Sequence, residues 1–171
     1  EAIANQDGGL EVFGGVERLC EHSLLRQEDG CEGEPRFAML ETVREYGLER
    51  LAASGEEETI RAAHGAHFLE LAEEAEPKLS GPEEGRWLGL LEADQDNLRT
   101  ALGWALGRDL ERAARLVAAM AAFWSSRAYL AEARDWCERA LASGDELPAA
   151  LRATLLDRTA MIAYQQGDFA V

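Results

Sequence analysis

The sequence predicts a mainly α-helical protein with one short β-hairpin near its start, followed by a helical bundle that becomes repetitive. Three observations predict this fold class. Apolar residues recur every three to four positions along most of the chain. Two short strand-like runs stand on either side of a polar loop at residues 28–35. Beyond residue 110 the helices are rich in alanine and alternate large with small residues.

The first 40 residues predict a helix followed by a hairpin. The helix is expected over residues 10–22, and the first strand begins at Leu24. A polar wing covers residues 28–35, and Phe37 and Met39 belong to the return strand. The apolar positions of the helix are Leu10, Val12, Phe13, Val16 and Leu19.

Three further helices are predicted in the middle of the chain. From Leu40 the apolar period changes from two to 3.6, which predicts a helix that ends at Gly55 in a left-handed conformation. A second helix is expected over residues 56–75, and a third, continuous one over residues 83–106, ended by Gly107. One stripe of the third helix is expected to face the core: Trp87, Leu91, Leu98, Leu102 and Ala105.

The last third of the chain predicts helices over residues 110–126, 129–142 and 148–165. Large residues that fill grooves and small residues where helices cross are typical of tetratricopeptide repeats. The residues that fit this pattern are Val117, Met120, Ala121 and Trp124, then Ala133, Cys137 and Ala140, then Leu156, Thr159, Ala160 and Ala163. The repeat is longer than the usual ~34 residues, and we assign the surplus to the loop at 143–147.

These elements suggest three parts. A hairpin that runs directly into a helix is how a winged-helix domain ends, so residues 1–40 are predicted to be the C-terminal part of such a domain. Residues 41–108 are predicted to be linking helices, and residues 109–171 a tetratricopeptide-like solenoid whose last repeat is truncated. Because the chain starts at Glu1 and stops within a repeat, we expect it to be an excised piece of a longer protein.

The charge of the chain argues against several partners. There are 33 acidic and 17 basic residues, a formal net charge of -16, and Lys78 is the only lysine. Nucleic-acid binding depends on Lys and Arg that neutralise phosphates, so contact with DNA or with anionic membrane surfaces is not expected. There is also no signal peptide and no apolar run of transmembrane length, which predicts a cytoplasmic protein.

No catalytic motif is found in the sequence. It lacks the phosphate-binding loop, the dinucleotide fingerprint and the nucleophile elbow. The three cysteines, Cys20, Cys31 and Cys137, have no metal-binding spacing, and we expect Cys137 to be a small buried residue rather than a nucleophile. We therefore predict that this chain is not an enzyme.

Two groups of polar residues are candidates for metal ligands. His64 and His67 share a helix face but have no third ligand nearby, so we interpret them as packing residues. Asp94, Asp96 and Asn97 offer oxygen ligands but are expected in mid-helix, where they cannot wrap a cation as a loop does. A structural role is predicted there instead, with bonds to neighbouring helices or loops from Asp96, Asn97 and Arg99. No metal is expected.

Two segments resemble a known family. Residues 36–51 read R-F-A-M-L-E-T-V-R-E-Y-G-L-E-R-L, and residues 91–106 read L-E-A-D-Q-D-N-L-R-T-A-L-G-W-A-L. Both resemble the C-terminal part of the NB-ARC, or STAND-type, ATPase module of bacterial multidomain transcription regulators. The resemblance implies that a winged helix closes a nucleotide-binding module and that helical repeats follow. ATP or ADP is then expected in an upstream domain, with no cofactor in this chain.

The resemblance also points to one position. Many members carry Met-His-Asp where this chain has Met39, Leu40 and Glu41, and in them the histidine touches the nucleotide phosphate. Leucine cannot bond phosphate, so direct nucleotide sensing is in question here, whereas Glu41 can brace the following helix. For a protein partner, the candidate residues of the repeat groove are Trp124, Arg127, Tyr129 and Trp136, although Trp124 and Trp136 also suit the core.

The expected partners are another protein or the upstream nucleotide-binding domain of the same chain. Two other functions remain open. A DNA-binding winged helix would use Arg18, Arg26 and Arg36 and bind duplex DNA in a salt-dependent way. A scaffold or oligomerisation module without nucleotide control would self-associate through residues 150–171.

Overall fold

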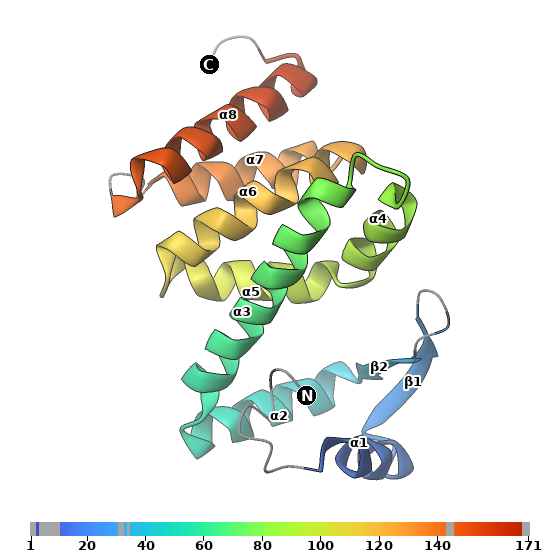
Figure 1. Ribbon diagram of the computed structural model, residues 1–171. Helices are drawn as coiled ribbons and strands as arrows, with labels where there is room; N and C mark the ends of the chain where they lie inside the picture. Colours follow the sequence, from blue (N-terminus) through green and yellow to red (C-terminus); the bar gives the residue numbers. More distant parts are fainter. Residues whose placement is uncertain (1–2, 4–10, 31–32, 34, 143–145, 169–171) are drawn as a thin grey trace. The chain divides into compact units, whose positions relative to one another are not determined.

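The computed structural model describes residues 3, 11–30, 33, 35–142 and 146–168 (Figure 1). It confirms the predicted fold class: a two-stranded antiparallel hairpin is followed by a helical bundle. The chain divides into two compact units, a first unit of residues 1–64 and a helical unit of residues 65–171. The predicted three-part division, with limits after residues 40 and 108, stays a prediction.

The first unit contains helix α1 (Val12–Glu21), strands β1 (Leu25–Asp29) and β2 (Pro35–Met39), and helix α2 (Glu41–Ser54). The two strands pair antiparallel, from Leu25 with Met39 to Asp29 with Pro35. The predicted limits of the wing were therefore too wide, because residues 28, 29 and 35 belong to the strands. A two-stranded ribbon can expose both faces to water, so polar side chains do not stop the pairing there.

Helix α2 starts and stops where the sequence predicts. Leu40 precedes it with an extended backbone (φ -60°, ψ 142°). Gly55 ends it with φ 80°, the left-handed conformation that glycine adopts without steric cost.

Apolar side chains of the first unit remain exposed. Among the described residues before Ala63, none is buried. Phe13 on α1 is 78% exposed and Tyr46 on α2 is 62% exposed. The helices form as predicted, but the apolar faces that predicted them do not close over a core within this unit.

Helix α3 (Glu57–Ala75) begins in the first unit and ends in the helical unit, where a short 3-10 helix, η2 (Glu76–Lys78), follows it. The remaining helices are α4 (Glu84–Ala93), α5 (Gln95–Leu106), α6 (Leu110–Ser126), α7 (Leu130–Ala142) and α8 (Ala149–Gln166). Helix α6 packs against α5, α7 and α8, and α7 also packs against α8. Helix α6 therefore lies at the centre of the helical unit.

The predicted continuous helix over residues 83–106 is wrong, because the chain breaks at Asp94. Asp94 has φ -103° and ψ 11° and belongs to neither helix. Its amide donates to the Leu90 carbonyl at 3.1 Å and its carbonyl accepts from the Leu98 amide at 2.9 Å. Asp94 thus closes α4 and opens α5, which run in different directions (Figure 1). Aspartate favours helix ends over helix interiors.

The core of the helical unit matches the predicted stripes. Side chains from α4, α5, α6 and α7 that were expected to face inward are buried: Trp87, Leu91, Leu98, Leu102, Ala105, Val117, Met120, Ala121, Trp124, Ala133, Cys137 and Ala140. Asp109 begins α6 by accepting from the Arg112 amide at 3.0 Å through its side chain. The apolar periodicity of these helices and the capping aspartate of α6 both depend on residues that are close together in the sequence.

Helix α8 differs from the expected register. Leu156 is 52% exposed and Ala160 is also exposed, whereas Leu155, Ile162 and Ala163 are buried. The spacing i, i+7, i+8 turns this second set toward α6 and α7. Of the four residues expected to restart the repeat, Leu156 and Ala160 therefore face solvent, and their predicted place in the repeat was wrong. In the expected loop, residues 143–145 lie outside the described residues, as does Phe169 after the α8 cap.

Candidate functional site

The proposed nucleotide-sensor position lies where β2 meets α2. Met39 ends the strand, Leu40 is 48% exposed, and Glu41 is the first helical residue. Arg44 donates to both Glu41 oxygens, from Nε at 3.0 Å and from its terminal nitrogen at 2.8 Å. These bonds lower the pKa of Glu41, so its carboxylate stays charged and braces the first turn. The side chain of Leu40 offers no hydrogen-bonding group.

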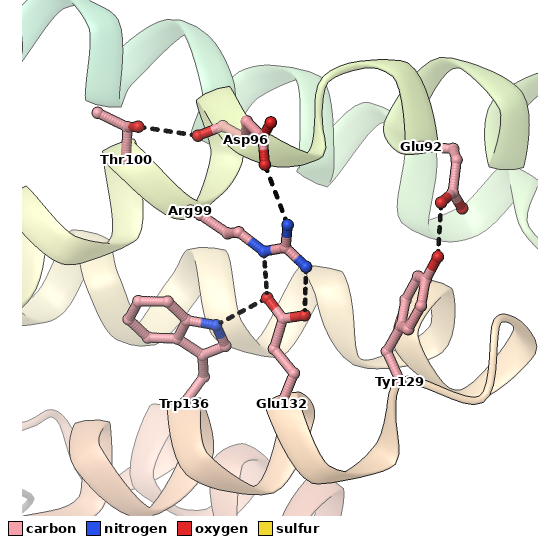
Figure 2. Close-up of polar contacts among 7 residues, drawn as sticks. All are labelled: Glu92, Asp96, Arg99, Thr100, Tyr129, Glu132 and Trp136. Carbon is pink, nitrogen blue, oxygen red and sulfur yellow. Dashed lines mark hydrogen bonds and ion pairs between the residues drawn. The ribbon is translucent and has the colours of Figure 1, made fainter. Parts of the chain in front are cut away.

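A second group of residues forms a polar seam between the α4–α5 pair and the start of α7 (Figure 2). The polar seam consists of Glu92, Arg99, Arg127, Tyr129, Glu132 and Trp136. Except for the bond between Trp136 and Glu132, its contacts join residues that are far apart in sequence, so the seam holds together elements that local structure alone would not join.

Arg99 and Glu132 form the centre of the polar seam. Arg99 on α5 donates to both oxygens of Glu132 on α7, at 2.8 and 2.7 Å, and the indole of Trp136 donates to the same carboxylate at 3.3 Å. Arg99 also bonds Asp96 at 3.0 Å. The hydrogen bonds from Arg99 lower the pKa of Glu132 despite its partial burial, and those same bonds raise the pKa of Arg99. Both groups remain charged at neutral pH.

The other half of the polar seam joins α4 to the turn between α6 and α7. The Tyr129 hydroxyl donates to Glu92 Oε1 at 2.6 Å, and Arg127 Nε lies 3.2 Å from Glu92 Oε2 as an ion pair. The bond to Glu92, together with burial, raises the pKa of Tyr129, which therefore stays protonated as a donor. Ala128, at the tip of the turn, has φ 60°, an uncommon value for a residue with a Cβ.

The structure places the four candidate groove residues in or beside this seam. Trp124 is 1% exposed and belongs to the core, and Trp136 is 8% exposed, with the Arg139 guanidinium 4.3 Å from its ring centre. Arg127 and Tyr129 both bind Glu92. The burial of the two tryptophans fits their alternative interpretation as core residues. A partner-binding role for the four residues stays a prediction.

Of the three polar residues expected to bond neighbouring helices or loops, Arg99 reaches a neighbouring helix directly. Asn97 donates to Asp94 at the α4–α5 junction, at 3.0 Å. Asp96 accepts from Arg99, and its backbone carbonyl accepts from the Thr100 hydroxyl at 2.8 Å (Figure 2). Their observed contacts are structural.

Sequence reasoning did not identify Glu92 and Glu132. Glu92 lies within the 91–106 segment that resembles the ATPase family, so the resemblance of that segment could have identified it as a candidate. Glu132 has no such signal, because it is one of many acidic residues on helices. Its role depends on an arginine 33 positions earlier in the chain.

The described residues hold no cluster of three or more His, Cys, Asp or Glu side chains that could bind a metal. His67 packs its ring edge against Phe68, with ring centres 5.0 Å apart. Cys137 is completely buried, and that burial raises the pKa of its thiol, which disfavours the reactive thiolate. Cys31 lies outside the described residues.

Within the described part of the chain, no helix has the length and apolarity needed to cross a membrane.

The candidate DNA-recognition helix, α1, presents acidic groups. Glu11 caps it by accepting from the Gly14 amide at 3.2 Å, and Glu17 and Glu21 are exposed. Arg18 donates to the Gly14 carbonyl at 3.1 Å within the same helix. An exposed acidic helix repels the phosphates that a recognition helix must approach.

Comparison with known proteins gives one kind of relative. The chain is 33% identical over 119 residues to "Putative HTH-type transcriptional regulator Rv0890c" of Mycobacterium tuberculosis, and equally to "Putative HTH-type transcriptional regulator Mb0914c" of Mycobacterium bovis. The match includes 69% of this chain and 13% of each relative's length. No protein-family model and no solved structure matches the chain. The similarity supports a context of bacterial transcription regulation.

Proposed function

We propose that this chain is a non-catalytic regulatory part of a bacterial STAND-type ATPase and transcription regulator. In this proposal the helical unit senses a partner or effector, and the first unit connects it to an upstream nucleotide switch. The relatives support the regulatory context, since their names describe transcription regulators of which this chain matches a minor part.

The observation that carries the proposal is the segment from residue 36 to residue 51. It resembles the end of the ATPase module, and it folds as a strand, an extended residue and a helix, the order expected where a winged helix ends. Leu40 and Met39 at that junction are both exposed. They are thus available to a surface supplied by another domain.

The exposed apolar side chains of the first unit are a second support. Phe37, Met39 and Leu40 on the hairpin and junction lie in water in this chain. Large apolar side chains that stay exposed are candidates for burial at an interaction site. Packing against the nucleotide-binding domain of the same protein would bury them, and the nucleotide could then control that contact.

The helical unit provides the sensing part in this proposal. Stacked helices form extended surfaces whose neighbouring elements are coupled through packing. A bound partner changes the switch only if it prefers one state of the protein, by a few kcal/mol for a nearly complete shift.

The test is to purify the natural protein with its upstream sequence, denature it and assay the released small molecules for ADP and ATP. One nucleotide per chain is expected. A protein that is empty and does not bind added ATP would overturn the switch and leave a scaffold function. If nucleotide is found, Leu40→His tests the junction, since a histidine there could reach phosphate and is expected to tighten nucleotide binding.

DNA binding by this chain itself is tested separately. The 171-residue chain is titrated into labelled duplex DNA at low salt, and fluorescence anisotropy is followed. We expect no binding, because the net charge is -16 and α1 is acidic. Binding that weakens with salt and with Arg18→Gln or Arg26→Gln would instead support a DNA-binding winged helix.

A further inference from the structure

A hollow of about 210 Å³ lies within the helical unit, and none of the residues that line it belongs to the polar seam. Its walls come from three parts of the chain: the residues after η2, the C-terminal half of α6, and α8. Figure 1 shows α6 and α8 as neighbours, in agreement with their packing contacts. The elements that form the hollow therefore belong to one packed unit.

Most of the wall is apolar. Ala121 and Ala122 leave space on α6, where larger side chains would fill it, and Ile162 forms part of the buried wall from α8. Met161 is 46% exposed and lies at the opening, where its flexible thioether can adapt to different shapes. Ser125 and Ser126 add hydroxyl groups that can donate or accept.

One positive charge lies in the wall, on Arg158. A terminal nitrogen of its guanidinium donates to Glu76 at 2.9 Å, and the other lies 4.0 Å from Asp157. The Nε atom has no acceptor among the described residues, but it is covered, so the donors that a ligand can reach are on the terminal nitrogens. A guanidinium has five N–H donors, so Arg158 keeps donors for a further acceptor.

We propose that this hollow binds a small monocarboxylate with a short hydrocarbon body. The apolar wall takes the hydrocarbon, and Arg158 with the serine hydroxyls takes the carboxylate. The volume is below the about 300–1,000 Å³ of pockets that hold drug-sized ligands, so it suits a smaller molecule. Glu76 and Asp157 next to Arg158 disfavour a multiply charged anion. This binding does not depend on the proposed nucleotide switch and would occur in its absence.

The first experiment is an NMR titration of the 171-residue chain with hexanoate, followed at the methionine methyl groups. The chain has three methionines. Met161 lies in the hollow, Met120 in the core and Met39 in the first unit, so the last two serve as internal references. A saturable shift confined to Met161 is expected. Hexan-1-ol, which lacks the carboxylate, should bind at least about tenfold more weakly.

A second arm separates a free acid from the end of a peptide chain. Ala-Ala-Leu with a free C-terminus offers the same carboxylate and apolar group, and its amidated form does not. Saturable binding of hexanoate, with no binding of the peptide that has a free C-terminus, supports a small-molecule site. Preferential binding of the free peptide would overturn the small-molecule assignment in favour of a peptide end.

Variants distinguish binding from structural support. Arg158→Gln should weaken hexanoate binding at least about tenfold, whereas Glu76→Gln should strengthen it by freeing the guanidinium. Arg152→Gln on the same helix and Glu111→Gln on α6 are the charge-matched controls and should leave binding unchanged. Ala122→Leu should abolish binding by filling the space.

If the Arg158–Glu76 pair only supports the fold, its two variants should lower stability alike and should not change binding in opposite directions. That result, or a hexanoate shift that does not saturate at Met161, would overturn the proposal. Each variant is first checked for an unchanged fluorescence spectrum of the tryptophans.

Discussion

The two units contain similar helices but bury them to different extents. In the first unit, α1 and α2 have no buried residue, and among the described residues before Ala63 none is buried. In the helical unit, by contrast, α6 buries ten apolar residues between Ala113 and Trp124. Periodic apolar residues thus predict a helix in both units, but they do not reveal whether the partner surface is present. The stability of the first unit has to come from elsewhere.

The chain offers a convenient way to test this difference. All four tryptophans, Trp87, Trp104, Trp124 and Trp136, lie in the helical unit. Their fluorescence reports the unfolding of that unit, whereas far-UV circular dichroism reports both units. The predictions below pair equivalent changes in the two units, in order of decreasing effect.

The largest effect is expected from removal of a phenylalanine ring. Phe123→Ala, at a completely buried position on α6, should lower the free energy of unfolding of the helical unit by about 3–5 kcal/mol. Phe13→Ala on α1 should change the free energy of unfolding of the first unit by less than about 0.5 kcal/mol, because that ring is exposed. Urea unfolding measures both effects, followed by tryptophan fluorescence for Phe123→Ala and by far-UV circular dichroism for Phe13→Ala. Equal effects would contradict the proposed difference in burial.

A smaller effect is expected from loss of an arginine–carboxylate pair. Arg99→Gln removes the two bonds to Glu132 and should cost the helical unit about 1 kcal/mol, since Arg99 is still partly in water. Arg44→Gln removes the same type of pair, with Glu41, from the exposed surface of α2 and should cost less than Arg99→Gln, because water screens an exposed pair. Urea unfolding by both probes tests this, and similar values would mean that the polar seam adds no stability.

Relief of backbone strain should give a gain. Ala128 and Ser23 are the described non-glycine residues with positive φ, 60° and 57°. Ala128→Gly should raise the free energy of unfolding of the helical unit by about 0.5–1 kcal/mol. Ser23→Gly relieves the same strain in the first unit and should leave the tryptophan transition unchanged. A loss of stability in Ala128→Gly would show that the turn is not strained.

The smallest effect concerns pH. Because the pKa of Glu132 is lowered in the folded protein, its contribution to stability is complete above the pKa of the unfolded chain, about 4.3. It is lost as the pH falls through the folded pKa. Wild type should therefore lose more stability than Glu132→Gln as the pH is lowered below about 4.3. Parallel curves for the tryptophan transition would contradict this.

Much of the fold could be predicted because its signals are local. The hairpin, the left-handed end at Gly55 and the core stripes of α4 to α7 all depend on residues within a few positions of one another. The break at Asp94 could not be seen, since the apolar stripe continues through it in the sequence. Only the three-dimensional packing of α4 and α5 shows that one stripe is divided between two helices.

The candidate sites were less predictable. The junction at Leu40 follows from a resemblance, and its role in nucleotide sensing stays a prediction. The polar seam depends on pairs such as Arg99 with Glu132, which are distant in sequence and have no motif. The hollow beside Arg158 combines three separate segments, and the face that α8 turns toward α6 decides which of its side chains line that hollow.

The most direct test of the difference between the two units is amide hydrogen exchange on the 171-residue chain. We expect amides of α6, α7 and the buried side of α8 to exchange at least about a thousandfold more slowly than those of α1, the hairpin and α2, because exposed elements open at little free-energy cost. Equally strong protection of both sets would contradict the account. It would show that the first unit is stable without a surface to cover its apolar side chains.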